Sequence, residues 1–379
     1  MPTTVINVVP EKVCAEDLAP AVAALRAGQL VIFPTETVYG VAANAADAAA
    51  VARLLAAKGR ADSQPFTVHL GRRQDAQLYV SDPPPLLRRL VRKAWPGPLT
   101  IVCAEAAPDR TEIARRCPPE QLQELYQGGT VGLRCPDHPV ALRLLADAGV
   151  PIVASSANRH GQPPPLDAAG AAAELGDAVA VVVDAGPTRH RVASTIVEVR
   201  GGRWRVLRPG ALDERTLERL TRRAVLFVCT GNSCRSPMAE HLFRRSLAEA
   251  LGVAAGELET YGYRVGSAGC AAGCGGPASS GALDEMRRRG FDLATHRTQP
   301  LTVELIAQAE RIYVMSAEHR QTVLGLAPAA APRVSLLDPQ GPVTDPIGGG
   351  ASEYARCAEQ IARALATRVQ EFLDEDRHW

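Results

Sequence analysis

The 379-residue sequence lacks a long apolar run, a sizeable net charge and a regular cysteine framework, and it is nearly without lysine. A membrane-spanning helix needs about 18 or more consecutive apolar residues, and no stretch approaches that length. The first residues, MPTTVINVVPEK, do not join a basic segment to an apolar run, as a secretory signal would. The formal net charge of +1 implies no bulk attraction to nucleic acid or membrane. We therefore expect a cytoplasmic protein with no membrane association.

The nine cysteines are scattered without the spacing of a disulfide scaffold, which suits a reducing compartment. Cys270 and Cys274 come nearest to a metal-binding pair, but no second pair and no partnered histidines accompany them. We predict no metal site in the protein itself. Because the chain has so few lysines, Lys58 stands out as a candidate for binding, although a solvated surface charge is the simpler interpretation.

At this length the chain should form two domains. Short β-rich runs such as QLVIFPT and AVLFVCT alternate with alanine- and leucine-rich helical stretches, which is the pattern of an α/β protein. The stretch RPGALDERTLERLTRR contains a proline-glycine stop followed by one charged helix. We therefore predict a domain over residues 1–210, a helical linker over 211–222 and a second domain over 223–379.

The second domain opens with the loop VCTGNSCRSPMAE, residues 228–240. AVLFV before it reads as a buried strand, Ser236 suits a helix N-cap and Pro237 suits the first helical turn. Free backbone N–H groups and the helix dipole at such a place favour an anion, and the same field favours the thiolate form of Cys229. Arg235 adds a planar fork that matches phosphate oxygens. No Gly-Lys-Ser/Thr follows, so a nucleophilic cysteine attacking phosphorus is expected rather than a nucleotide loop.

A second cysteine and arginine share the C-x5-R spacing, since Cys357 and Arg363 occur in CAEQIAR. That stretch reads as a helix, where residues six apart point to different faces, so it should not form a site. The nucleophile also needs a general acid, for which Asp338 and Asp345 are the candidates. Asp345 is favoured because IGGG follows it and could close over a site.

These motifs, with VGSAG (265–269), GGPAS (275–279) and TDPIGGG (344–350), resemble the low-molecular-weight protein tyrosine phosphatase family. The resemblance implies a four-stranded parallel sheet flanked by helices and a reaction without metal. It implies that Cys229 forms a phosphocysteine, that Arg235 binds the phosphoryl oxygens and that Asp345 acts as acid and then base. It also implies that Asn232 shapes the loop, that Ser236 hydrogen-bonds the thiolate and that Cys234 can form a reversible disulfide with Cys229. The phosphate-binding loop comprises Thr230, Gly231, Asn232, Ser233, Cys234 and Ser236.

The phosphatase substrate is left open by two positions. Ile347 replaces the aromatic residue that usually follows Asp-Pro in this family and stacks on a phenol ring. Thr230, directly after the nucleophile, resembles the protein-arginine phosphatase branch. Phosphotyrosine and phosphoarginine both stay candidates, whereas arsenate reduction would need redox cysteines that RIYVMSAEHRQTVLG lacks.

In the first domain, Lys58-Gly59-Arg60 and Ser156-Ala157-Asn158 each place two polar groups on one side of a segment that reads as extended. The first pair offers two cations for phosphates, and the second offers a hydroxyl and an amide. Around them FPTETVYG, FTVHL, WPGPLT, TVGLRCP, STIVEV and LRPG occur in an order that resembles the YrdC/Sua5 family of threonylcarbamoyl-AMP synthases. Within GQPPPL a hydroxyl residue often met in that family is replaced.

This second resemblance implies an open, twisted α/β sheet with a concave cavity that joins L-threonine, bicarbonate and ATP into threonylcarbamoyl-AMP and pyrophosphate. The product would pass to the tRNA-modification machinery, and magnesium would accompany the ATP. The alternative is a noncatalytic RNA- or nucleotide-binding module attached to an active phosphatase. The resemblance implies that ATP is bound by Lys58, Arg60, Thr130, Ser156, Asn158 and Arg208. It implies that threonine is bound by Thr35, His69, Arg134 and Ser194.

Overall fold

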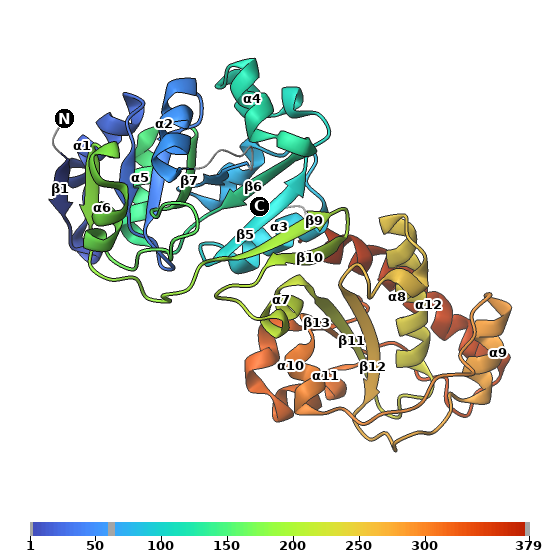
Figure 1. Cartoon of the computed structure of the whole chain (residues 1–379). Helices are drawn as coiled ribbons and strands as arrows, with labels where there is room; N and C mark the ends of the chain where they lie inside the picture. The colour runs from blue at the N-terminus through green and yellow to red at the C-terminus, as the bar shows by residue number, and fades with distance from the viewer. Residues whose placement is uncertain (1–2, 60–64, 376–379) are drawn as a thin grey trace. The chain divides into compact units, whose positions relative to one another are not determined.

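The computed structural model describes residues 3–59 and 65–375. The chain divides into two compact units, the first ending at Thr221 and the second beginning at Arg222 (Figure 1). Both units are α/β. Residues 211–222, which the sequence predicts as a helical linker, contain α7 (Glu214–Thr221), and α7 packs against α3 (Pro85–Ala94) of the first unit. Among the described residues, none of the helices combines the length and the apolarity that crossing a membrane requires.

The described part of the first unit contains a ten-stranded mixed sheet with the order β1-β8-β2-β3-β7-β4-β6-β5-β9-β10. Its pairs β1–β8, β2–β8, β4–β6 and β5–β9 are parallel and the others are antiparallel. The strands are β1 (Thr4–Asn7), β2 (Val31–Phe33), β3 (Gly40–Asn44), β4 (Thr67–His69), β5 (Leu99–Ala104), β6 (Thr130–Arg134), β7 (Ile152–Ser156), β8 (Val181–Asp184), β9 (Thr195–Arg200) and β10 (Arg203–Arg208).

Helices cover both faces of this sheet, because alternate strand residues point to opposite sides. In β2, Val31 and Phe33 pack in the cluster that holds α1 and α5, whereas Ile32 packs in the cluster that holds α2, α3 and α6. The two cores therefore share one sheet. The remaining helices of the unit are α1 (Ala15–Arg26), α2 (Ala48–Lys58), α4 (Pro119–Leu125), α5 (Pro139–Ala148) and α6 (Ala168–Leu175).

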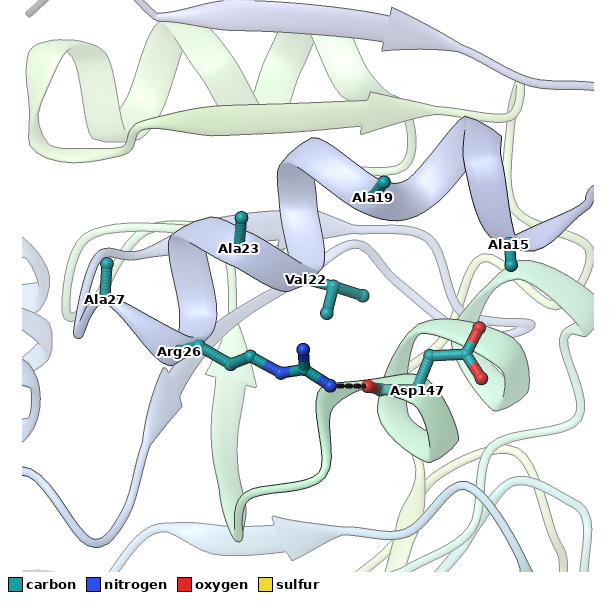
Figure 2. A pocket seen from close by; sticks show the side chains of 7 residues that line it. All are labelled: Ala15, Ala19, Val22, Ala23, Arg26, Ala27 and Asp147. Atoms are coloured by element: carbon teal, nitrogen blue, oxygen red, sulfur yellow. Dashed lines mark hydrogen bonds between the residues drawn. The ribbon is translucent and has the colours of Figure 1, made fainter.

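A shallow groove runs between α1 and α5, and Figure 2 shows Arg26 reaching across it. Its guanidinium donates to the carbonyl of Asp147 at 2.8 Å and to that of Ala148 at 2.9 Å. The last carbonyls of a helix have no partner within the helix, so this arginine satisfies the C-terminal end of α5.

The second unit has a four-stranded sheet in the order β12-β11-β13-β14, with every pair parallel. Helices α8, α9 and α12 contribute to the core on one face, and α10 and α11 contribute to the core on the other. The predicted four-stranded parallel sheet flanked by helices is confirmed. The elements are β11 (Arg223–Cys229), α8 (Arg235–Leu251), β12 (Tyr263–Gly269), α9 (Ser280–Arg288), α10 (Val303–Gln308), β13 (Arg311–Val314), α11 (Ala317–Leu326), β14 (Val334–Leu336) and α12 (Ala351–Asp374).

Candidate active sites

The cysteine loop of the second unit joins the end of β11 to the start of α8. Cys229 is the last residue of the strand, and Arg235 is the first residue of the helix. The prediction that Ser236 is the N-cap is wrong, since Cys234 occupies that position. The reason is that Ser236 lies inside the first turn, fully buried, with its hydroxyl oxygen 3.0 Å from the sulfur of Cys229.

The sulfur of Cys229 is surrounded by hydrogen-bond donors. The backbone N–H of Asn232 donates to it over 3.3 Å, and the Ser236 hydroxyl is within reach as a second donor. Cys229 itself is only 2% exposed. The loop backbone and the first turn of α8 thus hold the sulfur in place.

Asn232 holds the shape of the loop. Its φ of 53° is left-handed, a conformation that asparagine tolerates better than most residues. Its fully buried amide nitrogen donates at 2.9 Å to both Ser236 and Ser267, and its side-chain oxygen accepts from the backbone N–H of Gln299 at 3.0 Å. Ser267 and Gln299 were not predicted as site residues, although Ser267 lies within the VGSAG motif.

Gly269, at the end of β12, allows the loop to approach the neighbouring strand. A Cβ atom on this residue would be 2.6 Å from the carbonyl oxygen of Thr230 and 2.8 Å from the nitrogen of Asn232. Both atoms belong to the loop backbone, so only glycine fits here without displacing the loop.

Arg235 and Asp345 come together although 110 residues separate them. The two side chains form an ion pair, with Arg235 8% exposed and Asp345 40% exposed. The guanidinium also donates to the carbonyl of Val343 and to the hydroxyl of Thr230, each at 3.4 Å. The predicted nucleophile loop and the favoured general acid therefore lie at one place.

The two rejected alternatives lie elsewhere in the unit. Asp338 accepts from the side chain of Gln360 at 2.9 Å and caps its own turn through the N–H of Gln340. Cys357 and Arg363 lie within α12, as predicted, and burial raises the pKa of the Cys357 thiol to about 12. The second loop cysteine, Cys234, hydrogen-bonds to Ser279 at 3.1 Å.

In the first unit a cavity of about 380 Å³ opens among β3–β7, β9 and β10. It brings together seven of the ten predicted binding residues from segments far apart in the chain. These are Thr35, His69, Arg134, Ser156, Asn158, Ser194 and Arg208.

Arg134 is the buried cation of this cavity. Its guanidinium donates to the carboxylate of Glu36 at 3.0 Å and to the hydroxyl of Thr37 at 2.6 Å. Glu36 is fully buried and also accepts from the N–H of Asp137 at 3.0 Å. Among the described residues, the Nε of Arg134 has no partner. An unpaired buried donor is costly, and Arg134 lines the cavity, so its guanidinium is the candidate contact for an anionic ligand.

His69 and Ser194 are the polar groups on two other walls. Burial, reinforced by the charge of Arg134, lowers the pKa of His69 to about 3, so the ring is neutral. Its Nδ1 lies 3.1 Å from the carbonyl oxygen of Thr67, which can only accept, so Nε2 is left as an acceptor. Ser194 lies 3.0 Å from the hydroxyl of Thr100, and its carbonyl accepts from Arg208 at 2.7 Å.

The three remaining predicted residues are Lys58, Thr130 and Arg60. Lys58 is not part of an extended segment, because it ends α2 and Gly59 follows with a left-handed φ of 60° as the helix C-cap. Its ammonium donates to the carbonyl of Ser156 at 2.6 Å and thereby holds the segment that carries Asn158. Thr130 begins β6 and is not among the residues that line the cavity. Arg60 lies outside the described residues.

Two family models match the chain, one over each unit. The Sua5/YciO/YrdC model, described as telomere recombination, matches residues 23–210, and the low molecular weight phosphotyrosine protein phosphatase model matches residues 224–378. The chain belongs to both families. A Mycobacterium tuberculosis relative of the first family is 45% identical over 196 residues, which is 52% of this chain and 85% of that protein.

Two further relatives of the Sua5/YciO/YrdC unit differ in how much of the chain they cover. The threonylcarbamoyl-AMP synthase of Chromohalobacter salexigens is 34% identical over 190 residues, which is 50% of this chain and 95% of that enzyme. The structure of Pyrococcus abyssi Sua5 complexed with L-threonine matches with a TM-score of 0.51 at 22% identity, covering 96% of this chain and 98% of that one. At this identity the match shows the fold alone.

Proposed function

We propose that the first unit is a threonylcarbamoyl-AMP synthase that joins L-threonine, bicarbonate and ATP and releases pyrophosphate. The observation that carries the proposal is the cavity that gathers seven of the predicted binding residues, four of them on β4, β6, β7 and β10 and three in adjoining loops. The membership of the first unit in the Sua5/YciO/YrdC family supports the same reaction. The Chromohalobacter synthase is covered over 95% of its length by this half alone, so the half is long enough to act as a synthase.

In this proposal the guanidinium of Arg134, which lines the cavity, receives the threonine carboxylate, while Glu36 keeps that guanidinium in place. Neutral His69 offers an acceptor for the substrate, and Thr35 and Ser194 complete the threonine site. Arg208, Ser156 and Asn158 face the nucleotide, with Lys58 and Arg60 completing the phosphate contacts. Positioning and electrostatics then supply the catalysis, since we assign no covalent nucleophile to this cavity.

A second, mostly apolar cavity of about 250 Å³ shares Pro65 and Phe66 with the first one. Gln127 lines it and accepts, through its carbonyl, a hydrogen bond from the Thr130 hydroxyl at 3.3 Å. An apolar slot beside a polar cavity suits a purine base next to its phosphates. We assign the adenine ring to this slot, which places Thr130 at the ATP site.

Magnesium would arrive with the nucleotide. Among the described residues no group of three or more histidine, cysteine, aspartate or glutamate side chains could hold a metal ion. The triphosphate oxygens supply hard ligands instead, and the cation neutralises charge that would otherwise oppose attack on the α-phosphorus. The cytoplasm, where all nine cysteines can stay free thiols, is the proposed location.

Pyrophosphate release tests the synthase. The full chain is incubated with ATP, magnesium and bicarbonate, with and without L-threonine. Threonine-dependent pyrophosphate, lost in Arg134→Gln, supports the proposal, and transfer of the product by the tRNA-modification machinery would extend it. A folded protein that binds ATP yet releases no pyrophosphate above the threonine-free control would instead identify a noncatalytic nucleotide-binding module.

For the second unit we propose a metal-independent phosphoprotein phosphatase. The carrying observation is the convergence of Cys229, Arg235 and Asp345 at the head of α8. The sulfur attacks phosphorus, the bond to the leaving atom breaks, and Asp345 gives that atom a proton. Asp345 then takes a proton from water as the phosphocysteine is hydrolysed, which returns the free thiolate and phosphate.

Binding of the phosphoryl group requires Arg235 to exchange partners. In the structure its NH2 group is paired with Asp345, and the same fork is expected to hold the phosphoryl oxygens. Release of Asp345 on binding would free its carboxyl group to reach the leaving atom. Hydrolysis of an aryl phosphate by the full chain, absent in Cys229→Ser, tests this proposal.

Phosphotyrosine and phosphoarginine are both proposed as substrates to be compared. Ile347 beside the general acid is 64% exposed and offers no aromatic ring to stack on a phenol. Thr230 places a hydroxyl next to Arg235 at 3.4 Å. These two observations favour the phosphoarginine candidate, and peptides of one sequence carrying either modification decide between them.

A further inference from the structure

Behind the cysteine loop lies His319, which is part of neither the predicted site nor the reaction described above. It belongs to α11 and is only 6% exposed. Its Nε2 is 2.9 Å from the Thr230 hydroxyl oxygen, and its Nδ1 is 3.0 Å from the hydroxyl oxygen of Ser316. Both ring nitrogens are therefore engaged, and the ring connects α11 to the residue that follows the nucleophile.

The protonation state of this ring is fixed by its surroundings. Burial, and then the charge of Arg235, lowers the pKa of His319, against the smaller opposing influence of Glu318 and Asp345. A neutral imidazole has one donor and one acceptor. Two tautomers satisfy both contacts, and in the one with the proton on Nδ1 the ring donates to Ser316 and accepts at Nε2 from Thr230.

In the tautomer with the proton on Nδ1, the hydroxyl of Thr230 has a defined direction. Arg235 has donors only, so its contact at 3.4 Å uses one lone pair of the threonine oxygen. The hydroxyl proton points to His319. One lone pair is left, and because Thr230 is an exposed residue this lone pair is available to a ligand in the loop.

We propose that His319 is a positioning residue that turns the Thr230 hydroxyl so that its free lone pair accepts an N–H of the substrate, which favours phosphoarginine over phosphotyrosine. This inference rests on the proposed phosphatase function. A phosphorylated guanidinium carries N–H groups next to its phosphorus, whereas a phenyl ester carries ring carbons there. A polar group placed to accept a hydrogen bond disfavours a ligand that cannot donate one.

The test compares kcat/KM for phosphoarginine and phosphotyrosine peptides of one sequence. His319→Leu and Thr230→Val should each lower the ratio of the two values by about 10-fold or more, because the first removes the group that orients the hydroxyl and the second removes the hydroxyl itself. The double variant should lower it no further, since both changes break the same hydrogen bond. His319→Gln, whose amide can reach the position of Nε2, should recover most of the wild-type ratio.

His241→Gln is the matched control, because His241 is also partly buried and its Nδ1 contacts a backbone carbonyl, that of Pro237, at 3.0 Å. In His241→Gln the ratio of kcat/KM for the phosphoarginine peptide to that for the phosphotyrosine peptide should equal the wild-type ratio. An unchanged ratio in His319→Leu, or full additivity in the double variant, overturns the inference while the phosphatase proposal stands. A wild-type chain that hydrolyses neither peptide nor an aryl phosphate overturns the phosphatase proposal first, and this inference with it.

Discussion

Gly269 provides the sharpest test of the loop geometry, because the cysteine loop packs directly on its α-carbon. Gly269→Ala would place a methyl group 2.6 Å from the carbonyl oxygen of Thr230, whereas ordinary contacts begin at 3.4 Å. The loop must then retreat by about 0.8 Å, because two of the three obstructing atoms are loop backbone and the third is the Cβ of Ala272, so none can rotate away.

The magnitude follows from how the loop works. Overpacking of this kind costs about 1–3 kcal/mol of stability. Misplacement of a reacting group by about 1 Å costs on the order of 100-fold in rate, so we expect kcat/KM for an aryl phosphate to fall roughly 10- to 100-fold. The variant should stay folded and lose mainly catalytic efficiency, because β12 itself stays paired with β11.

Gly266, on the same strand, is the matched control. A Cβ atom there meets nothing within 4 Å, so Gly266→Ala should leave aryl phosphate hydrolysis unchanged. Steady-state kinetics and thermal unfolding of both variants separate loss of activity from loss of fold. Equal activity of the two alanine variants would refute the claim that close packing of the loop on β12 holds the nucleophile in place.

Three further predictions follow from the two sites. Cys229→Ser should abolish aryl phosphate hydrolysis, while Cys357→Ser should retain it, because burial raises the pKa of the Cys357 thiol to about 12 and keeps it protonated; equal loss in both would contradict the choice of loop. Asp345→Ala should slow hydrolysis of esters with poor leaving groups about 100-fold or more. Asp338→Ala should not, since Asp338 only hydrogen-bonds within its own turn and to Gln360. Plots of kcat against the pKa of the leaving group distinguish the two variants. For His69, the native pKa of about 3 lies below the ordinary 6.5, so unfolding takes up a proton between these values and stability falls as the pH drops. His69→Gln should make the decline in the free energy of unfolding between pH 7 and pH 4 shallower, measured by urea denaturation, and an unchanged slope would refute this.

The cysteine loop could be predicted because its signals are local. A buried strand, a C-x5-R spacing and a proline in the first turn adjoin one another in the sequence, and the structure has the strand and the helix there. Asp345 is distant in sequence from the loop, yet the Pro-Ile-Gly-Gly-Gly that follows it indicated that it is the general acid. Local chemistry of this kind is legible without knowing the tertiary structure.

The supporting residues were not predictable in the same way. Gln299 acts through a backbone N–H, which every residue except proline has, so its identity carries no signal. His319 lies in an ordinary helix and acquires its role only because α11, packed against β13 and β14, brings it to Thr230 of the loop. Lys58 was misplaced for another reason, since Gly59 ends a helix there in a left-handed conformation rather than continuing an extended segment.

Each site contains an ion pair between an arginine and a carboxylate, but the two pairs should differ in how easily they separate. Arg134 and Glu36 are both buried, and separating such a pair leaves an uncompensated charge at a cost of about 3–5 kcal/mol, so this pair should persist while a ligand is bound. Asp345 is 40% exposed, and pairs that water can reach are worth about 1 kcal/mol or less. Arg235 can therefore leave Asp345 for a phosphoryl group at little cost. Burial of the carboxylate thus decides which arginine is a fixed part of its cavity and which one exchanges partners during a catalytic cycle.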